Sequence, residues 1–167
     1  MSQEQVDFAE FYAGSRDDCL RTVLATVRDV DKAQDLVAEA FARAWASWRS
    51  VSRHPAPRAW VVRTALNLSV SSWRKHRREL PLMDHDAPAC GPAPIRVDTE
   101  LAAMLQQLPA RQRQVVALRI FLDLDTAQTA EVLGIAPGTV TAHLTRALEA
   151  LRTEFAAHAR ERGIHHE

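Results

Sequence analysis

Between Ala33 and Trp48, apolar residues recur every three or four positions along the chain. The series consists of Ala33, Leu36, Val37, Ala40, Phe41, Ala44, Trp45 and Trp48. This spacing places the side chains on one face of an α-helix, whereas a strand would need alternation. We expect Asp31 to cap the N-terminus of this helix. Because strand-like alternation between turn residues is missing throughout the sequence, the expected fold class is all-α.

Similar spacing predicts a helix on each side of this segment. The preceding one carries Phe8, Phe11, Leu20, Val23, Leu24 and Val27, and we expect it to be broken or bent near Gly14. After the loop SRHPAP, Pro57 suits the first turn of a helix that runs to about Arg78. Three packed helices would form one compact domain over residues 1–79.

A proline-rich stretch separates this domain from the rest of the chain. Residues 80–97 contain Gly91 and four of the eight prolines, Pro81, Pro88, Pro92 and Pro94, without sustained periodicity. That composition predicts a flexible linker. Helical patterns return at about 98–107, 110–122, 126–133 and 137–157. We therefore expect a second small helical domain over 98–157 and a tail over 158–167.

The net charge is zero, but the charges are distributed unevenly. Residues 43–78 contain no acidic residue and nine basic ones: Arg43, Arg49, Arg53, Arg58, Arg63, Arg74, Lys75, Arg77 and Arg78. Residues 1–42 instead hold nine acidic residues against four basic ones. An acid-free basic stretch is typical of a surface that meets phosphates.

Other features argue against secretion, membrane insertion and enzymatic chemistry. No signal peptide and no run of about 18 apolar residues is present, so a cytoplasmic protein is expected. Cys19 lies among apolar residues and is expected to be buried as a small hydrophobic group. No P-loop, GxSxG or HExxH motif occurs, and His54, His76, His85 and Cys90 match no compact metal site. We expect no enzyme activity, no cofactor and no metal.

The segment TAQTAEVLGIAPGTVTAHLTRALEALR, residues 126–152, has the pattern of a helix-turn-helix. Gly134 would supply the left-handed turn residue, and Ala130 would allow a close helix crossing. The expected packed side is Val132, Leu133, Ile135, Val140, Leu144, Leu148 and Leu151. The opposite side would present Thr139, Thr141, His143, Thr145 and Arg146 to base edges and phosphates. The alternative is a helix pair that serves only as scaffold.

All four tryptophans lie inside the acid-free stretch: Trp45, Trp48, Trp60 and Trp73. Aromatic and basic residues together suit melted nucleic acid, because an aromatic face can stack on an opened base while arginines hold the backbone. Packing is the alternative. Trp45 and Trp48 share a helix face with Phe41 and are expected in the core, whereas Trp60 and Trp73 fit either role.

Three segments, in this order, resemble the extracytoplasmic-function group of bacterial RNA polymerase sigma factors. DKAQDLVAEAFARAW, residues 31–45, is similar to the helix that docks on the clamp helices of the polymerase's largest subunit. PRAWVVRTALNLSVSSWRKHRRE, residues 57–79, is similar to the helix and basic tail that engage the minus-ten promoter element. Residues 108–152 are similar to the domain that reads the minus-thirty-five element. The resemblance implies a sigma factor that binds core RNA polymerase and promoter DNA, both duplex and melted.

The resemblance also implies roles for individual residues of the first domain. Asp35 and Glu39 would face polymerase, with Leu36 and Phe41 supporting their helix; a solvated acidic face is the alternative. A base flipped from the non-template strand would be enclosed by Arg43, Asn67 and the loop with Arg49, Ser52, Arg53 and His54. A simple exposed asparagine is the alternative at position 67. Phosphate contacts would come from Arg63, Arg74, Lys75, Arg77 and Arg78, which position DNA without specifying its sequence.

The second domain departs from the family pattern. Family members often have basic residues near Thr141 and His143, and an acidic residue where Ser71 stands. Arg146 is the one obvious cation on the presumed reading face, so we expect weaker minus-thirty-five contacts than usual. Residues 108–122 would pack under the recognition motif and offer a surface to the flap of the second-largest polymerase subunit. That segment includes Leu118, Ile120, Phe121 and Leu122, for which plain core packing is the alternative.

Two further possibilities concern partners and function. An anti-sigma factor is common in this family, although no residue of the sequence identifies one. The main rival function is a helix-turn-helix transcriptional regulator that binds DNA independently of core polymerase. Such a regulator would not need the acid-free helix with its tryptophans and Asn67.

Overall fold

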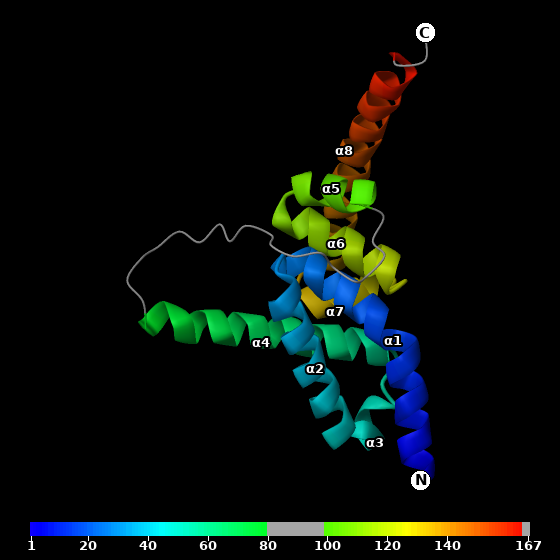
Figure 1. Cartoon of the computed structure of the whole chain (residues 1–167), viewed down its shortest axis with the longest axis vertical. Coiled ribbons are helices and arrows are strands. Elements are labelled where there is room, and N and C mark those ends of the chain that lie inside the picture. The colour runs from blue at the N-terminus through cyan, green and yellow to red at the C-terminus, as the bar shows by residue number, and fades with distance from the viewer. Residues whose placement is uncertain (80–98, 165–167) are drawn as a thin grey trace.

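The computed structural model describes residues 1–79 and 99–164, apart from the side chains of 72–79, Thr99, Ala102, Arg162 and Ile164. The described residues form eight helices and no strand, which confirms the all-α fold class (Figure 1). The helices are α1 (Gln3–Val27), α2 (Val30–Ala46), α3 (Trp48–Val51), α4 (Pro57–Glu79), α5 (Thr99–Gln107), α6 (Ala110–Phe121), α7 (Thr126–Leu133) and α8 (Pro137–Ile164). The predicted linker, 80–97, lies outside the described residues.

Helix α1 runs through Gly14 without interruption, so the expected break is absent and a bend is the alternative that remains. Figure 1 shows that the helix nevertheless changes direction along its length. Its first turn is fixed by a capping box, in which the side chains of Ser2 and Gln5 each accept a backbone N–H from the other residue. At its end Arg28 adopts the left-handed conformation, with φ 61°.

The N-cap of helix α2 lies two residues earlier in the chain than expected. The N-cap is Asp29, whose carboxylate accepts the Lys32 backbone N–H at 2.9 Å, and Asp31 lies inside the first turn. The expectation for Asp31 is therefore wrong, because the cap must be the extended residue that precedes the helix. The apolar series ends in a separate short helix, α3, and α4 starts at Pro57 as predicted.

The second half of the chain contains the predicted helix pair. Asp125 and Gln128 form a capping box at the start of α7, and Gly134 ends it in the left-handed conformation, with φ 64°. Helix α8 begins at Pro137 and continues past residue 157 to Ile164, projecting away from the body in Figure 1. None of the described helices is both long and apolar enough to cross a membrane.

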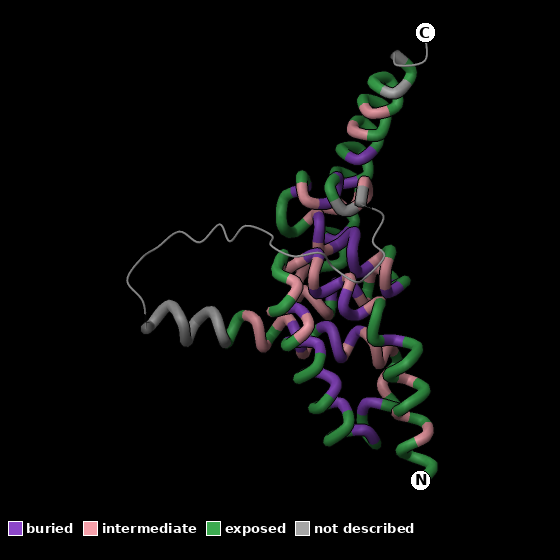
Figure 2. The backbone as a smooth tube through the Cα atoms, viewed as in Figure 1, coloured by how far each residue is buried: buried purple, intermediate pink, exposed green. Residues whose placement is uncertain are grey.

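The largest hydrophobic core contains residues from both halves of the chain (Figure 2). Leu20 and Val23 of α1, Phe41 of α2 and Val61 of α4 are buried in it. Leu118, Leu122 and Leu124, which follow the linker in sequence, are buried in the same cluster. Helix α6 packs on α1, and α7 packs on α4. The sequence had not predicted this contact between the two halves.

Two glycine substitutions should change stability in opposite directions. An added Cβ meets nothing within 4 Å at Gly14 or at Gly134, so backbone conformation alone decides the effect. Gly14→Ala should stabilise the protein by about 0.5–1 kcal/mol, because alanine favours a helix interior. Gly134→Ala should destabilise it by about 1 kcal/mol, because position 134 is left-handed. Urea unfolding of both variants measures the difference, and equal shifts would contradict the assigned conformations.

Candidate nucleic-acid interface

Helix α4 separates a buried face from an exposed polar stripe. Ala59, Val61, Val62 and Ala65 are buried against the core. Arg63, Asn67 and Ser71 are exposed and are spaced four residues apart, so they follow one another along the same side of the helix. The Ser71 hydroxyl donates to the backbone carbonyl of Asn67 at 3.1 Å, so this hydrogen bond does not involve the Asn67 side-chain amide. The stripe places an amide beside a cation on a surface that solvent can reach.

Acidic residues from outside the basic stretch neutralise several of its arginines. Arg43 pairs with Glu39 of its own helix at 2.8 Å, and Arg49 pairs with Glu4 of α1 at 2.8 Å. Each of these side chains is more than half exposed. Exposed ion pairs contribute only about 0–1 kcal/mol, so an incoming phosphate can displace the carboxylates. These arginines are therefore available to an anionic ligand.

Arg58 differs from the other arginines because it belongs to a more enclosed network. The Asp18 carboxylate accepts from Arg21 at 2.9 Å and from Arg58 at 3.3 Å, and all three side chains are mostly covered. Beside them Cys19 is fully buried, and its thiol lies 4.0 Å from the Arg58 carbonyl oxygen. Burial raises the pKa of the Cys19 thiol to about 12. The cysteine is thus a packing residue, as predicted, and Arg58 holds α4 to α1.

The connection between α3 and α4 exposes polar side chains at one end of α4. Ser52 and Arg53 are exposed, and Arg53 makes no ion pair in the described part of the chain. His54 is half-buried, and its Nδ1 accepts the Ala56 backbone N–H at 3.0 Å. His54 therefore shapes the turn, whereas Ser52 and Arg53 are the side chains of this loop that are open to a ligand.

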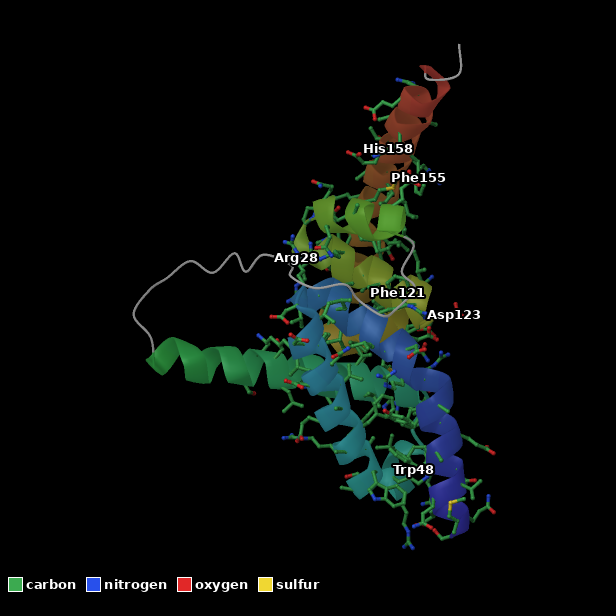
Figure 3. The ribbon with its side chains drawn as sticks, viewed as in Figure 1. Arg28, Trp48, Phe121, Asp123, Phe155 and His158 are labelled. Atoms are coloured by element: carbon green, nitrogen blue, oxygen red, sulfur yellow. The ribbon has the colours of Figure 1, made fainter. Side chains whose placement is uncertain are left out.

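The tryptophans have different environments. Trp48, labelled in Figure 3, is 9% exposed. The centroid of its ring lies 5.2 Å from that of Phe8 and 5.1 Å from that of Phe11. The ring centroids of Trp45 and Phe8 are 5.1 Å apart, but Trp45 remains 42% exposed. The expectation that Trp45 lies in the core is therefore only partly correct. Trp60 is half-buried against the core, and the side chain of Trp73 lies outside the described residues, as do those of Arg74, Lys75, Arg77 and Arg78.

Helix α2 presents an acidic face opposite its buried one. Asp35 and Glu39 are exposed and four residues apart, so they lie on one side of the helix. Leu36 and Phe41 are buried in the core and hold the helix in place. The two residues predicted to meet polymerase thus lie on the exposed side of α2, and the two predicted to support the helix lie on its buried side.

The helix-turn-helix forms as predicted, with Ala130 buried between α7 and α8. Val140 and Leu151 are buried on the inner side of α8, but Leu148 is 38% exposed and does not belong to the packed side. Its prediction was wrong because successive helical residues are rotated by about 100°, which carries position 148 beyond the edge of the inner face.

The predicted reading residues of α8 form two rows. Thr139, His143 and Arg146 follow one row, and Thr141 and Thr145 follow another, on the two sides of the exposed face. The hydroxyls of Thr141 and Thr145 donate to the carbonyls of Pro137 and Thr141, at 3.2 and 3.0 Å. His143 is half-buried, and its Nδ1 has no hydrogen-bond partner among the described residues.

Sequence reasoning missed two small residues and an acid on the same exposed face. Gly138 and Glu149 are exposed and Ala142 is half-buried, and helical rotation places all three between the two rows. Small residues let a helix approach a groove closely, whereas Glu149 repels phosphate. Their positions follow from the helical period once the buried side is known. No group of His, Cys, Asp or Glu in the described ranges is arranged to hold a metal ion.

Two family models match the chain. The model described as Sigma-70 region 2 matches residues 12–79, and the one described as Sigma-70, region 4 matches residues 98–151. RNA polymerase sigma-E factor of Streptomyces coelicolor is 32% identical over 92% of this chain and 89% of its own length. ECF RNA polymerase sigma factor SigW of Bacillus subtilis is 28% identical, over 91% of this chain and 90% of its own.

Solved structures share the fold. Sigma factor RpoE, in complex with the anti-sigma factor NepR from Bartonella quintana, matches with a TM-score of 0.67 at 23% identity. The match covers 88% of this chain and 95% of the RpoE chain. CnrH in complex with the cytosolic domain of CnrY matches with a TM-score of 0.63 at 22% identity, over 92% of this chain and 90% of that one.

Removing the exposed carboxylates should barely affect folding. In the double variant Glu4→Gln and Glu39→Gln, the free energy of unfolding should fall by less than about 1 kcal/mol, because exposed ion pairs are weak. Asp18→Asn should lower it by about 1–2 kcal/mol, since one half-covered carboxylate serves two arginines there. Urea denaturation measures both losses of unfolding free energy. A larger loss for the double variant than for Asp18→Asn would mean that Arg43 and Arg49 are needed for stability rather than available to a ligand.

Proposed function

The chain belongs to the sigma-70 family, among its extracytoplasmic-function RNA polymerase sigma factors, and on that premise we propose how its surfaces bind core polymerase and promoter DNA. The observation that carries the proposal is the exposed stripe of Arg63, Asn67 and Ser71 on α4, in a chain that also contains a well-formed helix-turn-helix. One surface suits melted DNA and the other suits duplex DNA. Two such surfaces in this order match the two elements of a promoter.

The minus-ten surface consists of α4 and the loop that precedes it. Asn67 offers an amide that can hydrogen-bond a flipped base. The other residues proposed to enclose that base are Arg43, Arg49, Ser52, Arg53 and His54. Trp60 would supply an aromatic ring near the start of the helix, and Trp73 is the second aromatic residue that we propose for this role. Arg63, together with Arg74, Lys75, Arg77 and Arg78, neutralises phosphates. The weakness of the exposed ion pairs supports this role, because it leaves the arginines ready for exchange.

The acidic face of α2 is the proposed seat on polymerase. Asp35 and Glu39 would meet the clamp helices of the largest subunit, while Leu36 and Phe41 fix their helix to the core. Seating on polymerase solves an energetic problem, because flipping a base costs a few kcal/mol and a small domain needs a larger anchor. We therefore propose that α4 engages melted DNA only when α2 is docked. The flap of the second-largest subunit is the proposed partner of the second domain, through residues near Ile120.

The minus-thirty-five surface is the exposed side of α8. Thr139, Thr141, His143, Thr145 and Arg146 would line the major groove, with Ala142 and Gly138 allowing close approach. Arg146 is accompanied by Glu149 on the same face, so the local charge is not strongly positive. We propose that this contact is weak and depends on the polymerase-bound arrangement.

Several broader proposals follow from membership of the family. The protein would catalyse no reaction itself, require no cofactor, and act in the bacterial cytoplasm. An anti-sigma factor is a further candidate partner, supported by the solved structure of sigma factor RpoE in complex with the anti-sigma factor NepR. A regulator that binds DNA without polymerase is less well supported, because it would have no use for the α4 stripe.

Neutralising the α2 face should weaken association with core polymerase. In the double variant Asp35→Asn and Glu39→Gln, affinity should fall at least about tenfold, because two charged contacts are lost. Fluorescence anisotropy of labelled protein with purified core polymerase measures the effect. The control is Glu10→Gln with Asp17→Asn, which makes the same charge change on exposed positions of α1. Unchanged affinity in the α2 variant, or an equal loss in the control, would contradict the assigned seat.

Substitutions in the two proposed DNA surfaces should have separate effects. Asn67→Ala should reduce promoter opening, detected by permanganate reactivity, while polymerase affinity is unchanged.

Arg146→Ala should lower the slope of log affinity against log salt by about 0.9 for holoenzyme on duplex DNA, since one phosphate contact is lost. Arg160→Ala, at the exposed far end of α8, is the control and should leave that slope unchanged. Specific duplex binding by the free protein would instead favour the independent regulator.

A further inference from the structure

The exposed face of α8 divides into two rows with different chemistry. Helical spacing places Thr139, His143 and Arg146, which we call the donor row, on one side of the face. The other side carries Thr141, Thr145 and Leu148, which we call the methyl row. Because the rows lie on opposite sides of one helix, they meet different parts of a DNA groove.

The hydroxyl protons of the methyl row are already used within the helix. Thr141 donates to the Pro137 carbonyl at 3.2 Å, and Thr145 donates to the Thr141 carbonyl at 3.0 Å. A hydroxyl has one proton, so each of these side chains offers a ligand only an acceptor oxygen and a methyl group. Leu148 adds an apolar side chain that is 38% exposed. These three side chains therefore have no free N–H or O–H to donate to a phosphate.

His143 of the donor row presents a hydrogen-bond donor. It follows the buried Val140 by three positions, which places it at the edge of the inner face of α8. Its Nδ1 is buried and has no hydrogen-bond partner among the described residues, so Nε2 is the ring nitrogen that a ligand can reach. Buried N–H groups without an acceptor are rarer than buried acceptors without a donor. The neutral ring therefore carries its proton on Nε2, from which it can be donated to a ligand.

Arg146 supplies the charge of the donor row. It is exposed and forms no ion pair within the ranges that the structure describes. A guanidinium only donates hydrogen bonds, whereas the oxygens of a DNA phosphate only accept them. Arg146 and His143 thus match the DNA backbone, and the methyl row does not.

The methyl row instead matches an A·T base pair in the major groove. Adenine presents its N6 amino group there as a donor, and thymine presents its C5-methyl group. An exposed threonine whose hydroxyl can only accept complements both features, through its oxygen and its methyl group. A G·C pair offers the cytosine N4 donor but no methyl group. Leu148 extends the apolar part of this surface.

We propose that α8 lies rolled in the major groove, with the donor row on the phosphate backbone of one strand and the methyl row against base edges, where it selects A·T pairs. This inference rests on the proposed function and names the base pairs that the minus-thirty-five surface prefers. Gly138 and Ala142 lie between the rows and let the helix approach closely enough for the short threonines to reach base edges. The donor row then positions the helix, and the methyl row specifies the sequence.

Replacing thymine with deoxyuridine tests the methyl row, because this change removes only the C5-methyl group. The probe is a duplex promoter fragment that the holoenzyme selects from random sequences, with one thymine upstream of the melted region replaced at a time. At one or two positions the affinity of the parent holoenzyme should fall about fourfold, as expected for one buried methyl group. The double variant Thr141→Ser and Thr145→Ser keeps both hydroxyls but loses both methyl groups, so it should lose this sensitivity.

Thr153→Ser is the matched control for the methyl row. Thr153 is also exposed on α8, and its hydroxyl donates to the Glu149 carbonyl at 3.0 Å, as those of the methyl row donate to their own helix. It lies two turns beyond Thr145, outside the proposed surface, so affinity and deoxyuridine sensitivity should stay as in the parent. Far-UV circular dichroism checks that α8 remains helical in each variant.

His143→Ala tests the donor row. Affinity should fall about twofold to tenfold, the effect of one lost hydrogen bond, and by the same factor on every probe. His143→Gln should recover most of that loss, because its amide nitrogen can replace Nε2 as a donor. Deoxyuridine sensitivity should persist in both variants.

Selected fragments without A·T pairs upstream, or with upstream thymines whose replacement has no effect, would overturn the A·T preference. Loss of deoxyuridine sensitivity in His143→Ala, but not in the double serine variant, would reverse the two rows and overturn the proposed roll of the helix. If the parent chain with core polymerase selects no sequence at all, the result counts against the proposed function instead.

Discussion

Packing of α1 against both halves of the chain is the constraint on which the rest of the structure depends. Leu20 and Val23 are buried in the core that α1 shares with α2 and α4, and α1 also packs on α6. The C-terminal turn of α1 also accepts the buried guanidinium of Arg113. Because α1 is shared in this way, it fixes the orientation of the α4 stripe and positions the helix-turn-helix beside it. Apolar burial supplies most of this order, and the buried arginine makes it specific to one helix end.

The arginines of this protein fall into two physical classes. Arg43, Arg49 and Arg63 are at least half exposed and paired with carboxylates that water screens, so they exchange partners easily. Arg113 is buried and donates to two backbone carbonyls, so removing it would leave those carbonyls unsatisfied. The exposed class suits contacts with a phosphate backbone, and the buried class suits a structural fastening. The same residue type therefore serves a buried contact between the two halves of the chain and, as we propose, DNA recognition on its surface.

The two proposed DNA surfaces are both modest. The α8 side has one clear cation next to an acid, and the α4 side is a short polar stripe. We propose that neither surface alone holds promoter DNA against the cost of flipping a base. Polymerase, which we propose to bind the acidic face of α2, would supply that missing free energy. Dependence on a larger partner would then follow from the modest surfaces.

The sequence by itself determined the helices, the helix-turn-helix and the family. These follow from local signals, such as Pro57 at a helix start, Gly134 in a left-handed turn and the spacing of the apolar residues. Periodicity shows which face of a helix is apolar, but it does not show which other helix covers that face. The sequence therefore missed the burial of Leu118 and Leu122 against α1–α4, and it could not assign Arg113 to the end of α1. The pairs Arg49–Glu4 and Arg63–Glu131 join residues 45 and 68 positions apart, and only the tertiary structure decided them, because such contacts depend on the packing of the whole chain rather than on neighbouring residues.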